Sequence, residues 1–277
     1  MRGKVPTTRP ALATLRSALF VPASAPERHP RAFAAGADAV ILDLEDSVAP
    51  AAKDSARHAL TERDGDTPAL ALVRINAPRT PAGREDLAAL PLMGAAGIVV
   101  PKADPEALDI AAQPGLPLVA LIETAAGILG AVEIAAHPAV ATVMLGPLDL
   151  GVDLGVSETH DGDELIAARS QIVIAAAAAG KRGPLDGPCL VPRDELALAR
   201  ETERARRLGF SGKACIHPAQ VAAVNRAFSP TREELEWARR VLDVFDGEAE
   251  GGAVLVDGEM IDEPVAGRAR KILAQRR

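Results

Sequence analysis

Short runs of apolar residues recur along the chain, and each is followed by an alanine-rich stretch whose apolar positions repeat with a helical period. The apolar runs predict eight strands, at residues 17–21, 39–44, 69–75, 97–101, 117–122, 142–145, a weaker 184–190, and 212–216. The stretches between them predict eight helices, at residues 26–35, 49–60, 84–92, 105–112, 126–136, 162–179, 193–208 and 218–228. Regular alternation of strands and helices is typical of a parallel sheet covered by helices.

The number of these units favours a closed barrel. Eight strand–helix units over residues 16–230 match the usual length of a (β/α)₈ barrel. An open doubly wound sheet normally has fewer strands and a glycine-rich first turn, and neither a GxGxxG nor a Walker A motif occurs in the chain. The sequence therefore predicts an α/β fold, a TIM barrel, as the catalytic domain.

Both ends of the chain are expected to extend beyond this barrel. Residues 1–15 carry basic residues without the apolar run of a signal peptide, which predicts a disordered leader. After the eighth unit come a polar helix at residues 231–245 and an acidic, glycine-containing linker at residues 246–252. Residues 231–277 are thus predicted to form a C-terminal helix and lid segment.

Charge and cysteine content exclude several classes of function. The net charge of −7 comes from segments of mixed sign, so the basic surface expected of a nucleic-acid-binding protein is missing. Cys189 and Cys215 belong to no metal-binding motif, and both are predicted to be small buried residues in a reducing compartment. No apolar segment approaches the length of a membrane span. The sequence predicts a cytoplasmic protein with neither nucleic-acid nor membrane partners.

Two acidic residues after consecutive strands are candidates for a metal site. The active sites of TIM barrels lie at the carboxyl ends of the strands, where Glu123 and Asp149 are expected to converge. Two hard oxygen ligands, with room left for water and substrate, suit Mg²⁺ better than Zn²⁺. A structural alternative is that these acids cap the helices that follow them.

The predicted strand ends carry further polar groups. Arg74 ends an apolar strand, so its guanidinium should meet a bound anion or form an internal salt bridge with Glu45 or Asp46. Lys102 is expected to form ion pairs rather than a Schiff base, because acids surround it. His217 is interpreted as a hydrogen-bonded structural residue rather than a general base.

A glycine-containing segment could contribute backbone donors. Residues 145–149, with Gly146 and Pro147, could present N–H groups near a helix start, which suits the carboxylate of an oxo-acid. Gly146 and Pro147 are therefore candidate substrate-binding residues.

Several short motifs occur in a fixed order along the chain. They are RSALFVP at 16–22, AVILDLEDSV at 39–48, VRIN at 73–76, VPK at 100–102, LIET at 121–124, and GFSGK at 209–213 followed by HPAQ at 217–220. Taken together, these motifs resemble the citrate lyase β-subunit-like branch of the HpcH/HpaI aldolase family. The resemblance covers nearly the whole chain after residue 15, and the order and spacing of the motifs make it specific.

The resemblance implies roles for individual residues. It implies that Glu123 and Asp149 bind Mg²⁺, that Arg74 contacts the oxo-acid and the reacting oxygen, and that Glu45 and Asp46 support the site from behind. The segment 257–264 is similar to the lid motif of the family, in which the residue matching Asp262 is an acid/base delivered into a neighbouring subunit's site. The resemblance thus implies a homo-oligomer, a trimer or a hexamer.

The implied activity is cleavage of a 3-hydroxyacyl-CoA, such as citryl-CoA, malyl-CoA or citramalyl-CoA, into an oxo-acid and acetyl-CoA, or the reverse condensation. One alternative is a metal-dependent aldolase that adds a pyruvate enolate to an aldehyde without coenzyme A. Another is a subunit active only in a larger complex with an acyl-carrier protein. Three departures from the family pattern bear on the substrate: Ala23 replaces a glycine, Glu27 interrupts a basic segment, and Leu148 replaces an acidic residue.

Overall fold

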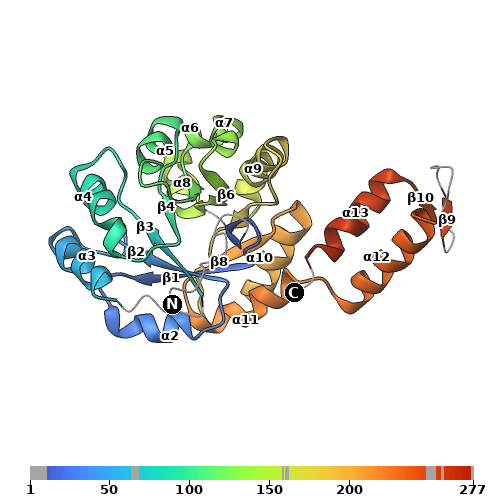
Figure 1. The fold of residues 1–277 in the computed structure, drawn as a ribbon, viewed down its shortest axis with the longest axis horizontal. Coiled ribbons are helices and arrows are strands. Elements are labelled where there is room, and N and C mark those ends of the chain that lie inside the picture. The colour runs from blue at the N-terminus through green and yellow to red at the C-terminus, as the bar shows by residue number, and fades with distance from the viewer. Residues whose placement is uncertain are drawn as a thin grey trace, which may run out of the picture. The chain divides into compact units, whose positions relative to one another are not determined.

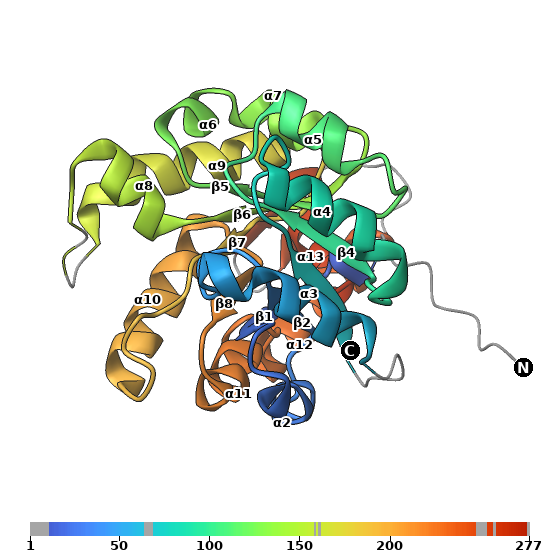
Figure 2. The ribbon, with the colours of Figure 1, turned by 90° about the vertical axis from the view of Figure 1, so that its left-hand side faces the viewer.

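The computed structural model describes residues 11–63, 69–157, 159, 162–247, 254–256 and 259–275. The chain divides into two compact units, residues 1–226 and 227–277. The first unit contains a closed barrel of eight parallel strands in sequence order. Its helices lie on the outside of the strands (Figures 1 and 2). The predicted TIM barrel is therefore confirmed.

The barrel strands are β1 (Ser17–Pro22), β2 (Ala39–Asp43), β3 (Leu70–Arg74), β4 (Gly97–Val100), β5 (Leu118–Ile122), β6 (Val140–Leu145), β7 (Leu185–Asp186) and β8 (Gly212–Cys215). The α-helices of this unit are α2 (His29–Phe33), α3 (Lys53–Thr61), α4 (Pro81–Ala89), α5 (Pro105–Ala111), α6 (Ala125–Leu129), α7 (Ala131–Ala136), α8 (Pro147–Leu154), α9 (Ile166–Ala178), α10 (Glu195–Leu208) and α11 (Pro218–Ala227). Short 3₁₀ turns lie at Pro26–Arg28, Pro50–Ala52, Leu90–Leu92 and Asp163–Leu165.

Almost every strand residue is buried, because the barrel has side chains on its inside and helices on its outside. Burial on both faces explains why the strands are continuous apolar runs in the sequence. The strands β1 and β8 pair in parallel register and close the barrel, with Ser17 opposite Lys213 and Leu19 opposite Cys215. Cys189 and Cys215 are free and buried, as the sequence predicted.

Residues 11–15 belong to the range in which the sequence predicted a disordered leader. Residues 1–10 lie outside the described residues, but Leu12 and Leu15 are 1% and 2% exposed and belong to the core cluster of the barrel. They pack at the end where β1 begins, so residues 11–15 are part of the barrel and not of a disordered leader.

Two other elements differ from the expectation. Strand β7 has only two residues where 184–190 was predicted, because Gly187 and Pro188 follow and proline cannot donate to a strand ladder. The helix α8 was not predicted. It begins at Pro147, where a proline without an N–H is tolerated, and ends before Gly155, whose φ of 68° is left-handed.

The second unit packs around a small core of its own. Its elements are α12 (Arg232–Phe245), β9 (Val254–Val256), β10 (Glu259–Ile261) and α13 (Glu263–Leu273). Ala238, Val241, Ile261 and Ala269 form its buried cluster. The unit begins at residue 227, whereas the sequence placed the boundary after residue 230. Residues 248–252 of the expected linker, together with Ala253, Asp257 and Gly258, lie outside the described residues.

None of the helices in the described part of the chain combines the length and apolar character needed to cross a membrane.

Candidate active site

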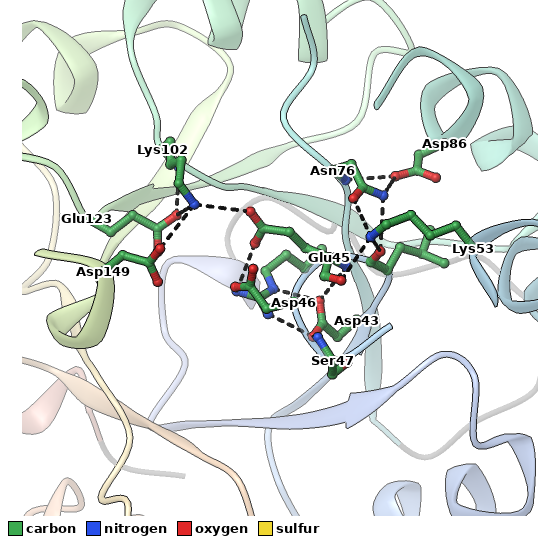
Figure 3. A network of polar contacts seen from close by, with 12 residues as sticks. Asp43, Glu45, Asp46, Ser47, Lys53, Asn76, Asp86, Lys102, Glu123 and Asp149 are labelled. Carbon is green, nitrogen blue, oxygen red and sulfur yellow. Dashed lines mark hydrogen bonds and ion pairs between the residues drawn. The ribbon is translucent and has the colours of Figure 1, made fainter. Parts of the chain in front are cut away.

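The acids predicted to converge do meet, around the side chain of Lys102 (Figure 3). Glu123 directly follows β5 and is 2% exposed, while Asp149 is the third residue of α8. Lys102 Nζ lies 3.8 Å from Glu123 Oε1 and 3.2 Å from Asp149 Oδ1. The two carboxylates thus face one position at which a positive charge is stabilised.

Lys102 is held in an unusual backbone conformation. Its φ of 46° makes it the one residue other than glycine with a positive φ that is recorded for the described chain. Its N–H donates to Glu123 Oε1 at 2.8 Å. Backbone strain of this kind is typical of functional sites. It lets one residue direct both its amide and its ammonium towards Glu123, so the ion-pairing role predicted for Lys102 is confirmed.

Helix capping does not account for Glu123. The N-cap of α6 is Thr124, whose side chain accepts the N–H of Gly127 at 3.0 Å. Asp149 lies in the first turn of α8, where a negative charge is favourable to the helix dipole. The structural alternative therefore applies to Asp149 alone, and the burial of Glu123 needs another explanation.

Arg74 makes the internal salt bridges that were the structural alternative for it. Its main partner is Asp43, which lies directly opposite it in the register of β2 and β3. Arg74 Nε and Nη2 donate to the two carboxylate oxygens of Asp43 at 2.6 and 2.7 Å. The ring of Phe20 lies under the guanidinium, 5.1 Å from Arg74 Cζ. Sequence reasoning did not include Asp43 in the site, because only the strand register brings it to Arg74.

Glu45 and Asp46 complete the surroundings of Arg74. Its Nη1 lies 2.9 Å from Glu45 Oε2 and 3.1 Å from Asp46 Oδ2. Glu45 Oε1 also lies 3.4 Å from Lys102 Nζ. Glu45 thus links the guanidinium of Arg74 to the ammonium of Lys102. These contacts agree with a supporting position next to Glu123 and Asp149.

The site contains more acids than cations. Five carboxylates, those of Asp43, Glu45, Asp46, Glu123 and Asp149, share Arg74 and Lys102. Burial raises the pKa of Glu45 to about 7. Burial and the charge of Glu45 raise the pKa of Glu123 to about 8. Burial would also raise the pKa of Asp43, but its hydrogen bonds with Arg74 hold that pKa below its ordinary value.

This imbalance fits a divalent cation between Glu123 and Asp149. A buried carboxylate with a raised pKa gains from an added positive charge. Among the described residues, no group of three or more His, Cys, Asp and Glu side chains is arranged to hold a metal. A pair of carboxylates leaves positions for water and substrate, which suits Mg²⁺.

A cavity of about 490 Å³ opens above these acids. Its apolar lining residues include Leu121 and Met144, which are buried, and Leu148, Leu190 and Ile216, which are exposed. The charged lining residues are Arg28, Asp43, Asp46, Arg74, Glu123 and Asp149. A cavity of this size is in the usual range for a small-molecule site.

Gly146 and Pro147 line this cavity, but within the segment 145–149 neither of these two residues has an amide left to donate to a ligand. The N–H of Gly146 donates to Ile122 O at 3.0 Å, and Pro147 has no N–H. The amides of Leu148 and Asp149 lie in the first turn of α8 and have no acceptor within their own helix. Any backbone donors to an anion here would come from α8 itself.

Gly146 has a steric role. A Cβ atom at this position would lie 2.5 Å from Glu123 Oε2 and 2.6 Å from Glu123 Cβ. Since Glu123 Cβ is fixed to the strand end, a side chain at 146 must displace the carboxylate. Glycine is therefore needed here for close approach and not for a positive φ.

We expect Gly146→Ala to destabilise the protein by about 1–3 kcal/mol, as overpacking does, and to weaken metal binding. Gly267→Ala is the matched control, because nothing lies within 4 Å of its added Cβ in helix α13. That control should leave metal binding unchanged and stabilise the protein slightly. Denaturant unfolding and titration calorimetry measure both effects, and wild-type metal affinity in Gly146→Ala would refute the steric role.

The remaining candidates from the sequence, His217 and Asp262, both form hydrogen bonds with nearby backbone amides. His217 Nδ1 accepts the N–H of Ala219 at 3.2 Å, so it is hydrogen-bonded as predicted. It borders a second, shallow hollow at the start of α10. Asp262 is the N-cap of α13, and its side chain accepts the N–H of Val265 at 3.2 Å.

Comparisons with known proteins agree with this geometry. A model of the HpcH/HpaI aldolase/citrate lyase family matches residues 16–218, and one described as C–C bond lyase of the TIM-barrel fold matches residues 168–275. A citrate lyase subunit beta-like protein of Mycobacterium tuberculosis is 41% identical over 260 residues, covering 92% of this chain and 93% of the relative.

Two further relatives differ in the activity or ligands they are named for. A (3S)-malyl-CoA thioesterase of Cereibacter sphaeroides is 39% identical over 269 residues, covering 94% of each chain. The crystal structure of CitE from Mycobacterium tuberculosis, in complex with magnesium, acetoacetate and coenzyme A, matches with a TM-score of 0.81 and 39% identity. That match covers 95% of this chain and 98% of the other.

Proposed function

The chain belongs to the HpcH/HpaI aldolase/citrate lyase family, and we propose on this basis that it is a Mg²⁺-dependent carbon–carbon lyase. Its substrate would be a 3-hydroxyacyl-CoA with a carboxylate on C3, such as malyl-CoA, citramalyl-CoA or citryl-CoA. The observation that carries the proposal is the meeting of Glu123 and Asp149 around one cationic position beside Arg74. The relative with magnesium and coenzyme A supports both the metal and the thioester.

The reaction would be a retro-Claisen cleavage. The C3 hydroxyl loses its proton and becomes a carbonyl, the C2–C3 bond breaks, and its electron pair stays on C2 beside the thioester. C2 then takes up a proton, so that one acyl-CoA gives one oxo-acid and one acetyl-CoA. Run in reverse, the same site condenses acetyl-CoA with an oxo-acid.

Each candidate residue has a part in this scheme. Glu123 and Asp149 would hold Mg²⁺, which when bound supplies Lewis acidity and a template for the substrate carboxylate and hydroxyl. Arg74, oriented by Asp43, would balance the negative charge that develops on the reacting oxygen. Asp262 of a neighbouring subunit would move the proton, and this requires a homo-oligomer.

The name of the 39% identical relative supports a second candidate activity, hydrolysis of the same class of thioester. In that reaction water attacks the thioester carbonyl, the carbon skeleton stays intact, and free coenzyme A is released. The aldolase without coenzyme A and the subunit of a larger complex are further alternatives.

A panel of acyl-CoA substrates assayed with the purified chain separates these activities. We expect the purified chain to form an oxo-acid from an acyl-CoA substrate, without an acyl-carrier protein, in the presence of Mg²⁺. No oxo-acid should form in the presence of a chelator. Turnover of a pyruvate enolate with an aldehyde and no acyl-CoA would favour the aldolase. Activity that requires an acyl-carrier protein would favour the complex.

The affinity for Mg²⁺ should depend on pH. Burial and the charge of Glu45 raise the pKa of Glu123 to about 8, and a protonated carboxyl cannot bind the metal. Below this pKa, Mg²⁺ must displace a proton, so its affinity should rise with pH and level off above about pH 8. Calorimetry in buffers of different ionisation enthalpy measures the released proton, and a constant affinity with no proton release would contradict this prediction.

A further inference from the structure

Lys53, the first residue of α3, lies behind the candidate site and uses its ammonium fully. Its Nζ donates to Leu44 O at 2.8 Å, to Glu45 O at 3.0 Å and to Asn76 Oδ1 at 2.6 Å. These three acceptors match the three N–H donors of a lysine. Figure 3 shows Glu45 between Lys53 on one side and Lys102 on the other.

Helix stability does not explain a lysine at this position. A positive charge in the first turn of a helix is opposed by the helix dipole. The side chain of Lys53 reaches back from α3 to two carbonyls of the segment that follows β2, so its binding partners lie in that segment.

Residues 44–47 are fixed from both sides. Asp43 accepts the N–H of Glu45 at 2.9 Å and of Ser47 at 3.2 Å, while Lys53 binds the carbonyls of Leu44 and Glu45. The segment therefore has its amides held by one charged side chain and its carbonyls by another of opposite sign. These hydrogen bonds restrict the orientation of the peptide groups that follow Leu44 and Glu45.

Asn76, the side-chain partner of Lys53, is itself held by hydrogen bonds. Asn76 Nδ2 donates to Asp86 Oδ2 at 2.7 Å and to Leu44 O at 3.0 Å. Asp86 is completely buried and accepts from Arg57 Nη1 at 2.9 Å. Lys53 thus connects the segment after β2 to a buried polar network outside the barrel strands.

The segment that Lys53 holds carries the acids that surround Arg74. Glu45 Oε2 and Asp46 Oδ2 lie within 3.1 Å of Arg74 Nη1, and Glu45 also meets Lys102. Lys53 does not line the cavity. We propose that Lys53 is a positioning residue for the reaction, which orients Arg74 through the segment 44–46. This inference rests on the proposed lyase activity.

The test compares Lys53→Met with Lys181→Met. Supporting residues of this kind typically contribute about 10–100-fold, so kcat/KM of Lys53→Met should fall by about that factor. Its Mg²⁺ affinity should fall much less than kcat/KM, because Glu123 directly follows β5, Asp149 lies in α8, and Lys53 Nζ contacts neither of them. Lys181 also donates to a carbonyl, that of Val140 at 2.7 Å, but at the start of β6, so Lys181→Met should keep wild-type turnover.

A chemical rescue separates positioning from a general loss of structure. Alkylation of Lys53→Cys with 2-bromoethylamine restores an ammonium at nearly the length of lysine, and iodoacetamide gives a neutral side chain. The two native cysteines are buried, and wild-type protein treated in parallel controls for them. We expect kcat/KM to recover after aminoethylation and not after carbamidomethylation.

The outcomes are distinguishable from failure of the lyase proposal. Turnover of wild-type protein is established first, so an inactive wild type counts against the lyase activity alone. With an active wild type, unchanged kcat/KM in Lys53→Met overturns the role of Lys53. Equal recovery with both alkylating reagents, or a loss of Mg²⁺ affinity as large as the loss of kcat/KM, also overturns it.

Discussion

Replacing Glu123 by glutamine is expected to abolish Mg²⁺ binding and to lower turnover by at least about 10³-fold, because metal Lewis acidity contributes several kcal/mol to such reactions. The fold should survive. Glutamine keeps the oxygen that accepts the N–H of Lys102 at 2.8 Å, and it resembles the protonated carboxyl that burial already favours. The thermal midpoint without metal should therefore equal or exceed that of the wild type.

Asp149→Asn should have the same effect on binding and turnover. Asparagine keeps the size of the side chain in the first turn of α8 and removes its charge. Titration calorimetry with Mg²⁺ and thermal unfolding measure the two consequences separately. Wild-type Mg²⁺ affinity in either variant would remove that residue from the metal site, whatever its effect on turnover.

The second large effect is expected for Asp262→Asn. This substitution should lower turnover by about 10²–10⁴-fold, the usual contribution of a general acid or base. The variant should fold normally, because Asp262 is the N-cap of α13 and asparagine is an equally good N-cap. The substitution therefore removes the acid/base group while keeping the start of the helix.

Complementation decides whether the group acts between subunits. Arg74→Ala and Asp262→Asn should each be inactive alone, yet a mixture that exchanges subunits should regain activity. Some sites in a hybrid oligomer would combine an intact Arg74 from one chain with an intact Asp262 from another. Hybrid oligomers verified by subunit exchange that regain no activity would mean that Asp262 acts within its own chain or has no catalytic part.

The barrel could be predicted from sequence because strands buried on both faces are continuous apolar runs. The failures have physical causes that one sequence does not reveal. Strand β7 has two residues and pairs with β6 through the single residue pair Met144 and Leu185. A strand this short leaves only a weak apolar pattern in the sequence. Helix α8 begins at Pro147 with Gly146 as its N-cap, and a Gly-Pro pair in a sequence is typical of a turn.

The facing acids of the site could be predicted from the sequence, but the residues that hold Arg74 and the segment after β2 could not. Glu123 could be found because it follows an apolar strand directly. The pairing of Arg74 with Asp43 depends on the register of β2 and β3, which the sequence does not contain. Lys53 was missed since a lysine within a predicted helix is normally interpreted as exposed. Its contacts join residues up to 23 positions apart.

The most direct test of the lyase activity is a product balance in deuterated water, using the acyl-CoA that the purified chain turns over fastest. Carbon–carbon cleavage predicts equal amounts of oxo-acid and acetyl-CoA, with one solvent deuterium in the acetyl group, since C2 takes its proton from exchangeable sites. Mass spectrometry measures all three quantities. Release of free coenzyme A with an intact hydroxy acid, and no labelled acetyl-CoA, would contradict the lyase activity.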